Sequence, residues 1–367
     1  MKKLLFTPGP LTTSDSVKRQ MLVDVGSRDS EFINAIKDIQ SELLRLAGVS
    51  KGEGYEAVII QGSGTFGIES VLSCSVPSDG KLLILSNGAY GERMVKIAEV
   101  HHLPFEVLRF DEDQVTSTQK VSEYLETHQS FTHLACVHSE TTTGLFNPIK
   151  EIGDLCFRHR IQYIVDAMSS FGGVTMDIKS SHIDFLVSSS NKCIEGVPGF
   201  SFAVCSKKSL DACKGQSRTL TLDIYAQWLG LETNGQFRFT PPTLSIMAFR
   251  QALKELEQEG GIAARESRYK QNKKNLDAGM TELGFKYYLA PEIQGHIITS
   301  FLYPDDPKFN FERFYQKLSE RGFVIYPGKL SKRDAFRIGN IGQIFPDDIS
   351  RLTIAIKEVL QEEGVTV

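Results

Sequence analysis

A lysine and an aspartate each follow a predicted strand. Lys192 comes after the apolar run 185–187 and a short polar step. The stretch 193–199 behind it contains Gly and Pro, which predicts a turn rather than a helix. Asp166 ends another apolar run, 161–165, and small residues follow it. The pattern therefore predicts an amine and a carboxylate at the ends of two strands.

This pair of residue types suits a pyridoxal phosphate site. In such a site a lysine forms a Schiff base with the cofactor, and a carboxylate pairs with the pyridinium nitrogen. Each residue also has a plainer interpretation when it is taken alone. Lys192 is then a surface lysine after a strand, and Asp166 is a helix cap or turn former. The functional interpretation therefore depends on the segments around the pair.

A glycine-rich segment, 61–67, follows the apolar run 57–60 and opens a predicted helix. Glycines let a backbone approach an anion, and Ser63 and Thr65 add hydroxyl groups beside free helix amides, so the segment suits a phosphate. It also matches the dinucleotide pattern G-x-G-x-x-G, which makes a nicotinamide-dependent oxidoreductase the main alternative. That fold needs an acid at the end of the next strand, but residues 85–88 are Leu-Ser-Asn-Gly. A plain structural turn also stays open.

Three further polar features lie at or within predicted strands. Tyr90 lies in a glycine-flanked loop, where its ring could stack on a planar cofactor or be a half-buried loop residue. The hydroxyl-rich loop 138–144 could contact the cofactor's phenolic oxygen or cap the next element. Arg337 lies within an apolar strand, where burial of a guanidinium requires an anion. That anion is either a carboxylate or phosphonate ligand, or a structural Asp or Glu.

The cysteines predict neither a disulfide framework nor a metal site. The six of them include no C-x-x-C pair, and most lie in apolar surroundings typical of buried thiols. Cys193 adjoins Lys192, so a catalytic thiol is an alternative there. Neighbours on an extended segment point to opposite faces, which counts against it.

Short apolar runs alternate with helical segments from about residue 57. The runs are 57–60, 82–85, 134–137, 161–165 and 185–187, and the helical segments are 66–71, 91–100 and 149–159. This alternation predicts an α/β fold with a mostly parallel, doubly wound sheet covered on both faces. The run 200–205 lies so near 185–187 that at least one antiparallel or edge strand is expected. Strand ends near 62, 86, 138, 166 and 188 all carry small, hydroxyl or charged residues, and ligands bind at such ends.

The character of the chain changes after about residue 243. One helical stripe holds Ile262, Tyr269, Leu276, Met280 and Leu283. Beyond it, strands are predicted at 297–302, 323–326 and 336–338, and helices at 311–318 and 349–360. We expect an N-terminal arm that reaches the site (1–12), a large domain (13–255) and a small α+β domain (256–367).

Composition excludes several other classes of protein. The net charge of −4 leaves no basic footprint for nucleic acid. Apolar stretches end well short of the roughly 18 residues that a membrane span needs. The apolar run near the start, 4–6, is too short for the core of a signal peptide, so a cytoplasmic location is expected.

The chain resembles fold type I pyridoxal phosphate enzymes of the branch that includes alanine–glyoxylate and serine–pyruvate aminotransferases. The likeness runs through segments 7–13, 61–70, 138–144, 165–173, 188–202 and 336–342. The segments 165–173 and 191–199 are specific to it, whereas the Thr-Pro-Gly-Pro start is shared more widely. Within that branch the likeness is strongest to enzymes that move the amino group of 2-aminoethylphosphonate to pyruvate.

The resemblance implies a role for each residue of the site. Lys192 would bind the cofactor and shuttle a proton, and Asp166 would keep the pyridine nitrogen protonated. The phosphate would be bound by Ser63, Gly64, Thr65 and, from a partner subunit, Thr243. Tyr90 would stack on the ring, Thr141 and Asn191 would flank the phenolic oxygen, and Arg337 would bind the anionic end of the substrate.

A phosphate ligand from the partner subunit would make a homodimer the catalytic unit. The implied reaction converts 2-aminoethylphosphonate and pyruvate into phosphonoacetaldehyde and L-alanine. An aminotransferase of the same branch that acts on an ordinary amino acid is the first alternative. A cysteine desulfurase is a more distant one, because it needs a cysteine in a mobile loop.

Overall fold

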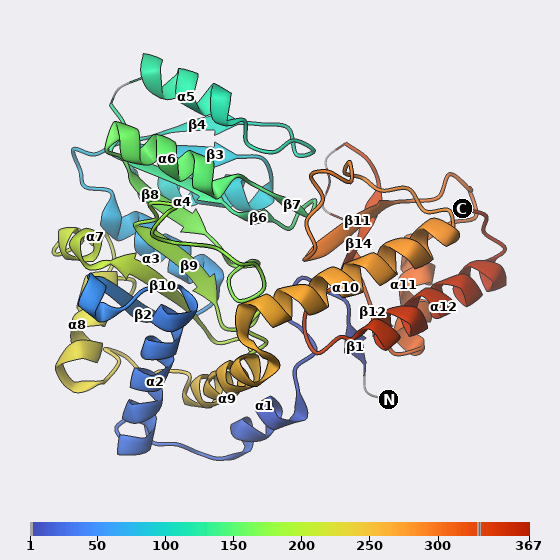
Figure 1. The fold of residues 1–367 in the computed structure, drawn as a ribbon, viewed down its shortest axis with the longest axis horizontal. Coiled ribbons are helices and arrows are strands. Elements are labelled where there is room, and N and C mark those ends of the chain that lie inside the picture. Colours follow the sequence, from blue (N-terminus) through green and yellow to red (C-terminus); the bar gives the residue numbers. More distant parts are fainter. Residues whose placement is uncertain (1–2, 129, 329, 331) are drawn as a thin grey trace.

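The computed structural model describes residues 3–128, 130–328, 330 and 332–367. Its main feature is a large sheet that forms the middle layer of the larger part of the molecule (Figure 1). Across the sheet the strand order is β2 (Tyr55–Gln61), β10 (Phe200–Ser206), β9 (Phe185–Ser189), β8 (Gln162–Asp166), β5 (His133–Val137), β3 (Leu82–Ser86) and β4 (Phe105–Arg109).

The large sheet is mostly parallel, as predicted. Strands β9, β8, β5, β3 and β4 are parallel to their neighbours in this series. Strand β10 runs antiparallel to both β2 and β9, which confirms the antiparallel strand expected at 200–205. The carboxyl ends of the parallel strands therefore meet at one edge of the sheet.

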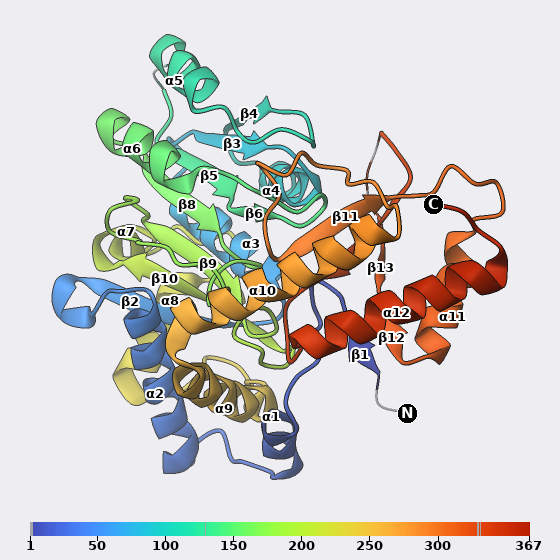
Figure 2. The ribbon, with the colours of Figure 1, turned by 45° about the vertical axis from the view of Figure 1, so that its right-hand side comes forward.

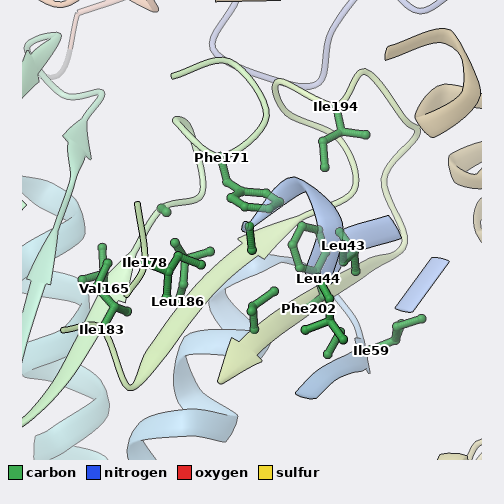
Figure 3. Close-up of a cluster of buried hydrophobic side chains, with 14 of the residues drawn as sticks. Leu43, Leu44, Ile59, Val165, Phe171, Ile178, Ile183, Leu186, Ile194 and Phe202 are labelled. Carbon is green, nitrogen blue, oxygen red and sulfur yellow. The ribbon is translucent and has the colours of Figure 1, made fainter. Parts of the chain in front are cut away.

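Both faces of this sheet are buried, because its strands are apolar at consecutive positions. In β5, Leu134 and Cys136 belong to one core, and Ala135 and Val137 belong to the other. Figure 3 shows part of the first core, where Phe202 of the sheet lies near Leu43 and Leu44, and Leu186 lies near Ile178.

Two sets of helices cover these faces. The first core includes side chains of α2 (Ser30–Leu46), α5 (Thr118–Thr127), α6 (Ile149–His159) and α9 (Thr243–Glu259). The second includes side chains of α3 (Gly64–Ser75), α4 (Ala89–Val100), α7 (Lys207–Ala212) and α8 (Ile224–Asn234). The fold is thus the doubly wound α/β arrangement that the sequence predicts.

A smaller antiparallel sheet lies beside the large one. Its strand order is β11 (Ile298–Leu302), β14 (Ala335–Gly339) and β13 (Tyr326–Pro327). The helices of this part are α10 (Gly261–Glu282), α11 (Phe311–Glu320) and α12 (Pro346–Glu363). Figure 2 shows α10 and α12 side by side, and a separate apolar core lies between these helices and the sheet. This is the predicted small α+β unit, while its boundary at residue 256 stays a prediction.

The N-terminal segment belongs in space to this smaller part. Strand β1 (Leu4–Leu5) pairs in parallel with β12 (Phe323–Val324). The chain then passes along the small sheet, where the amide of Gly339 donates to the carbonyl of Phe6 at 3.0 Å. Before helix α1 (Asp15–Arg19) begins, the carbonyl oxygen of Pro8 accepts a 2.6 Å hydrogen bond from Lys192, which lies beyond the end of β9. In the described part of the chain, no helix is both long and apolar enough to cross a membrane.

Candidate active site

A cavity of about 250 Å³ lies at the carboxyl edge of the large sheet. All five strand ends contribute to its wall, through residues at or after the ends of β2, β5, β8 and β9 and through the helix that follows β3. Its lining residues are Ser63, Gly64, Thr65, Ile68, Tyr90, Arg93, Met94, Val137, Ser139, Thr141, Asp166, Met168, Ser169, Ser189, Asn191 and Lys192. Eight of the ten predicted site residues are thus brought together.

Lys192 lies three residues beyond the end of β9, and its side chain reaches the cavity. The Nζ atom donates a 2.6 Å hydrogen bond to the carbonyl oxygen of Pro8, in the N-terminal segment. Loss of hydration lowers the pKa of Lys192 to about 8, because burial disfavours the charged ammonium. A larger fraction of the amine is therefore neutral and nucleophilic near pH 7 than in an ordinary lysine.

Asp166 is the last residue of β8 and is almost fully buried. Its Oδ1 atom accepts a 2.9 Å hydrogen bond from the amide of Met168. Burial nevertheless raises the pKa of Asp166 to about 6, because that single bond does not replace the lost hydration. Asp166 and Lys192, both described, form no ion pair with one another, although both line the cavity. A cationic ligand group beside Asp166 would stabilise its ionised form.

The start of α3 forms another wall of the cavity. Ser63 is the N-cap residue, but its side chain makes no capping hydrogen bond, so the first amides of the helix are left for another acceptor. A Cβ atom on Gly64 would lie 2.4 Å from Sδ of Met168, so a larger residue there would require the Met168 side chain to move. Gly67 packs the helix on the sheet, since a Cβ there would lie 2.7 Å from Oγ of Ser201. These contacts account for Gly64 and Gly67 without a dinucleotide.

Helix α4 contributes Tyr90 and, one turn later, Arg93. The first turn of α4 is capped from another strand: Glu140 of β6 (Ser139–Glu140) accepts a 3.2 Å hydrogen bond from the amide of Tyr90. Glu140 is fully buried, which raises its pKa, while hydrogen bonds from Thr142 oppose that rise. Sequence reasoning missed both Arg93 and Glu140. The i, i+3 spacing of Tyr90 and Arg93 was the available signal for the first of them.

Two hydroxyl groups in the cavity wall are buried without a hydrogen-bond partner. They are Oγ of Ser139 and Oγ1 of Thr141. Buried polar atoms are normally paired, so orphaned hydroxyls that line a cavity indicate a polar ligand. Together with Lys192, Asp166 and the open amides of α3, they fit a planar cofactor that carries a phosphate and a ring oxygen.

Arg337 lies behind this wall, in β14 of the small sheet. Its guanidinium donates to the carbonyl oxygens of Thr141 (2.6 Å, from Nη1) and Pro327 (3.0 Å, from Nε). Among the described residues no carboxylate lies within ion-pair distance of it, so the predicted alternative of a structural Asp or Glu partner is not found.

Thr243 and Cys193 lie outside the described wall of this cavity. Thr243 begins α9, and its predicted contribution to the site of a partner subunit stays a prediction. Cys193 is buried, and its Sγ atom donates to the carbonyl oxygen of Ser169 at 3.2 Å. Burial raises the pKa of Cys193 to about 12, so it is a thiol rather than a reactive thiolate. All six cysteines are buried, and none offers the mobile nucleophile of a desulfurase.

Comparison with known proteins agrees with this geometry. Residues 16–331 match the family model described as aminotransferase class-V. A protein of Phocaeicola vulgatus named 2-aminoethylphosphonate–pyruvate transaminase is 51% identical over 358 residues, which cover 97% of this chain and 98% of that protein.

Solved structures show the same fold. The ureidoglycine–glyoxylate aminotransferase of Bacillus subtilis superimposes with a TM-score of 0.90 at 22% identity, covering 100% of this chain and 94% of that one. The alanine–glyoxylate aminotransferase of Nostoc sp. has a TM-score of 0.89 at 26% identity, with coverage of 98% and 96%. The predicted fold type and the pyridoxal phosphate cofactor are thereby confirmed, and the nicotinamide alternative is set aside. The chain belongs to the class-V aminotransferase family.

Proposed function

We propose that this chain transfers the amino group of 2-aminoethylphosphonate to pyruvate, giving phosphonoacetaldehyde and L-alanine. The observation that carries the proposal is one cavity lined by Lys192, Asp166 and the open N-terminus of α3, with Arg337 directly behind its wall. The name of the 51% identical relative supports this choice of substrates.

When bound, pyridoxal phosphate supplies a carbonyl carbon for amino groups and a ring that accepts electrons. The Asp166 carboxylate would face the pyridine nitrogen and favour its protonated form. Lys192 would hold the cofactor through Nζ and, when that amine is free, would carry a proton to and from the Cα atom of the substrate. An amine with a pKa of about 8 suits this task, because such an amine can both accept and return a proton near neutral pH.

The remaining residues bind and orient the cofactor. Ser63, Gly64 and Thr65 hold the phosphate, with Thr243 of the partner subunit as a further ligand. Tyr90 stacks on the ring, and Thr141 and Asn191 flank its phenolic oxygen.

Arg337 binds the phosphonate of the first substrate and the carboxylate of pyruvate in turn. The planar guanidinium suits both anions. The catalytic unit in this proposal is a cytoplasmic homodimer.

The direct test is to incubate the purified protein with 2-aminoethylphosphonate and pyruvate and to assay for alanine and phosphonoacetaldehyde. Formation of both products in equal amounts is expected. If the protein instead converts alanine with glyoxylate, or serine with pyruvate, and ignores 2-aminoethylphosphonate, the alternative from the same branch is correct.

A further inference from the structure

Arg93 reaches from α4 across the cavity wall to the start of α3. Its Nη1 atom donates a 3.2 Å hydrogen bond to Oγ1 of Thr65, and its guanidinium carbon lies 4.8 Å from the centre of the Tyr90 ring. Both neighbours line the same cavity as Lys192. Arg93 is therefore placed between the residue proposed to stack on the cofactor's ring and a residue proposed to bind its phosphate.

The charge of Arg93 is not neutralised within the described part of the chain, where no carboxylate lies within ion-pair distance of it. The acidic residue beside it, Glu92, is already engaged. Its Oε1 atom accepts hydrogen bonds from Nε of Arg109 at 2.9 Å and from Oγ of Ser86 at 2.7 Å. A guanidinium that faces a cavity without a carboxylate partner is suited to an anion that enters the cavity.

The position of Arg93 indicates which anion that is. The α3 amides and the hydroxyls of Ser63 and Thr65 are uncharged donors, whereas a phosphate monoester carries close to two negative charges near neutral pH. Arg337 lies on the other side, next to Thr141. We propose that Arg93 binds the cofactor's phosphate, and that Arg337 is left for the substrate's anion. This inference depends on the placement of the phosphate proposed above.

Equilibrium binding to the cofactor-free protein tests the inference without reference to activity. Pyridoxal phosphate and pyridoxal, which has a hydroxyl in place of the phosphate, are titrated against wild type, Arg93→Ala and Arg93→Lys. Lys96→Ala is the matched control, because Lys96 is an exposed cation one turn further along α4 and does not line the cavity.

We expect Arg93→Ala to weaken binding of pyridoxal phosphate by about 10–100-fold, the effect of losing a hydrogen-bonded charge. Binding of pyridoxal should be unchanged, Arg93→Lys should lie between wild type and Arg93→Ala, and Lys96→Ala should match wild type. Because Arg93 is exposed, circular dichroism should show an unaltered fold in the variants.

Other outcomes would overturn the inference. If Arg93→Ala weakened the binding of pyridoxal phosphate and of pyridoxal equally, Arg93 would act on the cofactor's ring through Tyr90. Unchanged cofactor binding with a raised KM for 2-aminoethylphosphonate would mean that Arg93 binds the substrate's phosphonate. In both cases the proposed reaction would stand. Failure of the wild-type protein to bind pyridoxal phosphate at all would instead overturn the proposed function as well.

Discussion

The guanidinium of Arg337 donates a 2.6 Å hydrogen bond from Nη1 to the backbone carbonyl of Thr141. This bond joins β14 of the small sheet to the loop that follows β6. A second bond, to the carbonyl of Pro327, fixes the other side of the guanidinium, and the Tyr326 ring centre lies 5.6 Å from its carbon. Neutral groups thus orient Arg337. Its positive charge is left for a ligand at the junction of the two parts of the molecule.

We predict that Arg337→Ala weakens substrate binding in both half-reactions of the proposed transamination, each by about 10–100-fold. The reason is that one guanidinium binds the anion of both substrates. Arg337→Lys should restore little, since an ammonium lacks the planar fork of a guanidinium and has too few donors to keep two backbone bonds and also present two donors to one anion. Single-turnover absorbance of the bound cofactor separates the halves, first with 2-aminoethylphosphonate and then with pyruvate.

Cofactor binding is the control for this prediction, because the phosphate is held elsewhere in the proposed site. If Arg337→Ala impaired only the half-reaction with pyruvate, the assignment of one arginine to both anions would be wrong. The phosphonate would then be held by another cation of the site, such as Arg93.

Asp166→Asn tests the proposed contact with the pyridine nitrogen. Asp166 is 5% exposed and has no cationic side chain within ion-pair distance in the described part of the chain. Loss of one member of a buried charge pair costs about 3–5 kcal/mol, and if most of this appears in the transition state, kcat should fall by roughly 10²–10³-fold. Asparagine is isosteric, so the fold and the elution volume in gel filtration should not change. A kcat near that of wild type would mean that Asp166 only caps the following turn.

Much of this site could be predicted from sequence because it lies at strand ends. The apolar runs before Asp166 and Lys192 are short and continuous, which is typical of strands buried on both faces, and parallel strands end at a common edge. The predicted helix at 149–159 matches α6 residue for residue.

Elements whose environment is set by distant parts of the chain could not be predicted in this way. Strand β4 lies at the edge of the sheet, so its sequence Phe-Glu-Val-Leu-Arg is only partly apolar and gave no signal. Arg93 and Thr65 are 28 residues apart, and Glu140 caps a helix that begins about 50 residues earlier. These contacts depend on how α3, α4 and β6 pack against one another. The spacing of Tyr90 and Arg93 places both residues on one face of a helix, but it does not indicate that the face lies against the start of α3.

The pKa of Lys192 leads to a prediction of pH dependence. A lysine must lose its proton before Nζ can attack a carbonyl, so the reactive fraction rises as the pH rises through the pKa of the folded protein. Because that pKa is lowered to about 8, the rate of covalent attachment of pyridoxal phosphate should level off above about pH 8. Borohydride trapping followed by mass spectrometry measures the rate and should place the label on Lys192.

Lys192→Arg is the control for non-specific labelling and should trap nothing in the active-site peptide. A rate that continues to rise towards pH 10.5, the usual lysine value, would contradict the lowered pKa.

Glu195 lies three residues after Lys192, in the segment 190–199, which we call the lysine loop. It joins this loop to the small α+β part of the molecule. Its Oε1 atom accepts hydrogen bonds from Arg268 (2.8 Å) and from the hydroxyl of Tyr269 (2.6 Å), both in α10. Its Oε2 atom accepts from Gln343 at 2.7 Å. Glu195 is 2% exposed, so its removal leaves buried donors without an acceptor.

We predict that Glu195→Ala lowers the free energy of unfolding by about 3 kcal/mol, near the lower end for a broken buried ion pair, because Glu259 still contacts Arg268. Glu362→Ala is the matched control. Glu362 pairs with Arg321 and Lys317 at the surface, where such pairs contribute about 0–1 kcal/mol. Urea denaturation followed by circular dichroism measures both variants. Equal, small effects would mean that the lysine loop is held by its own backbone contacts and that Glu195 adds little to the junction.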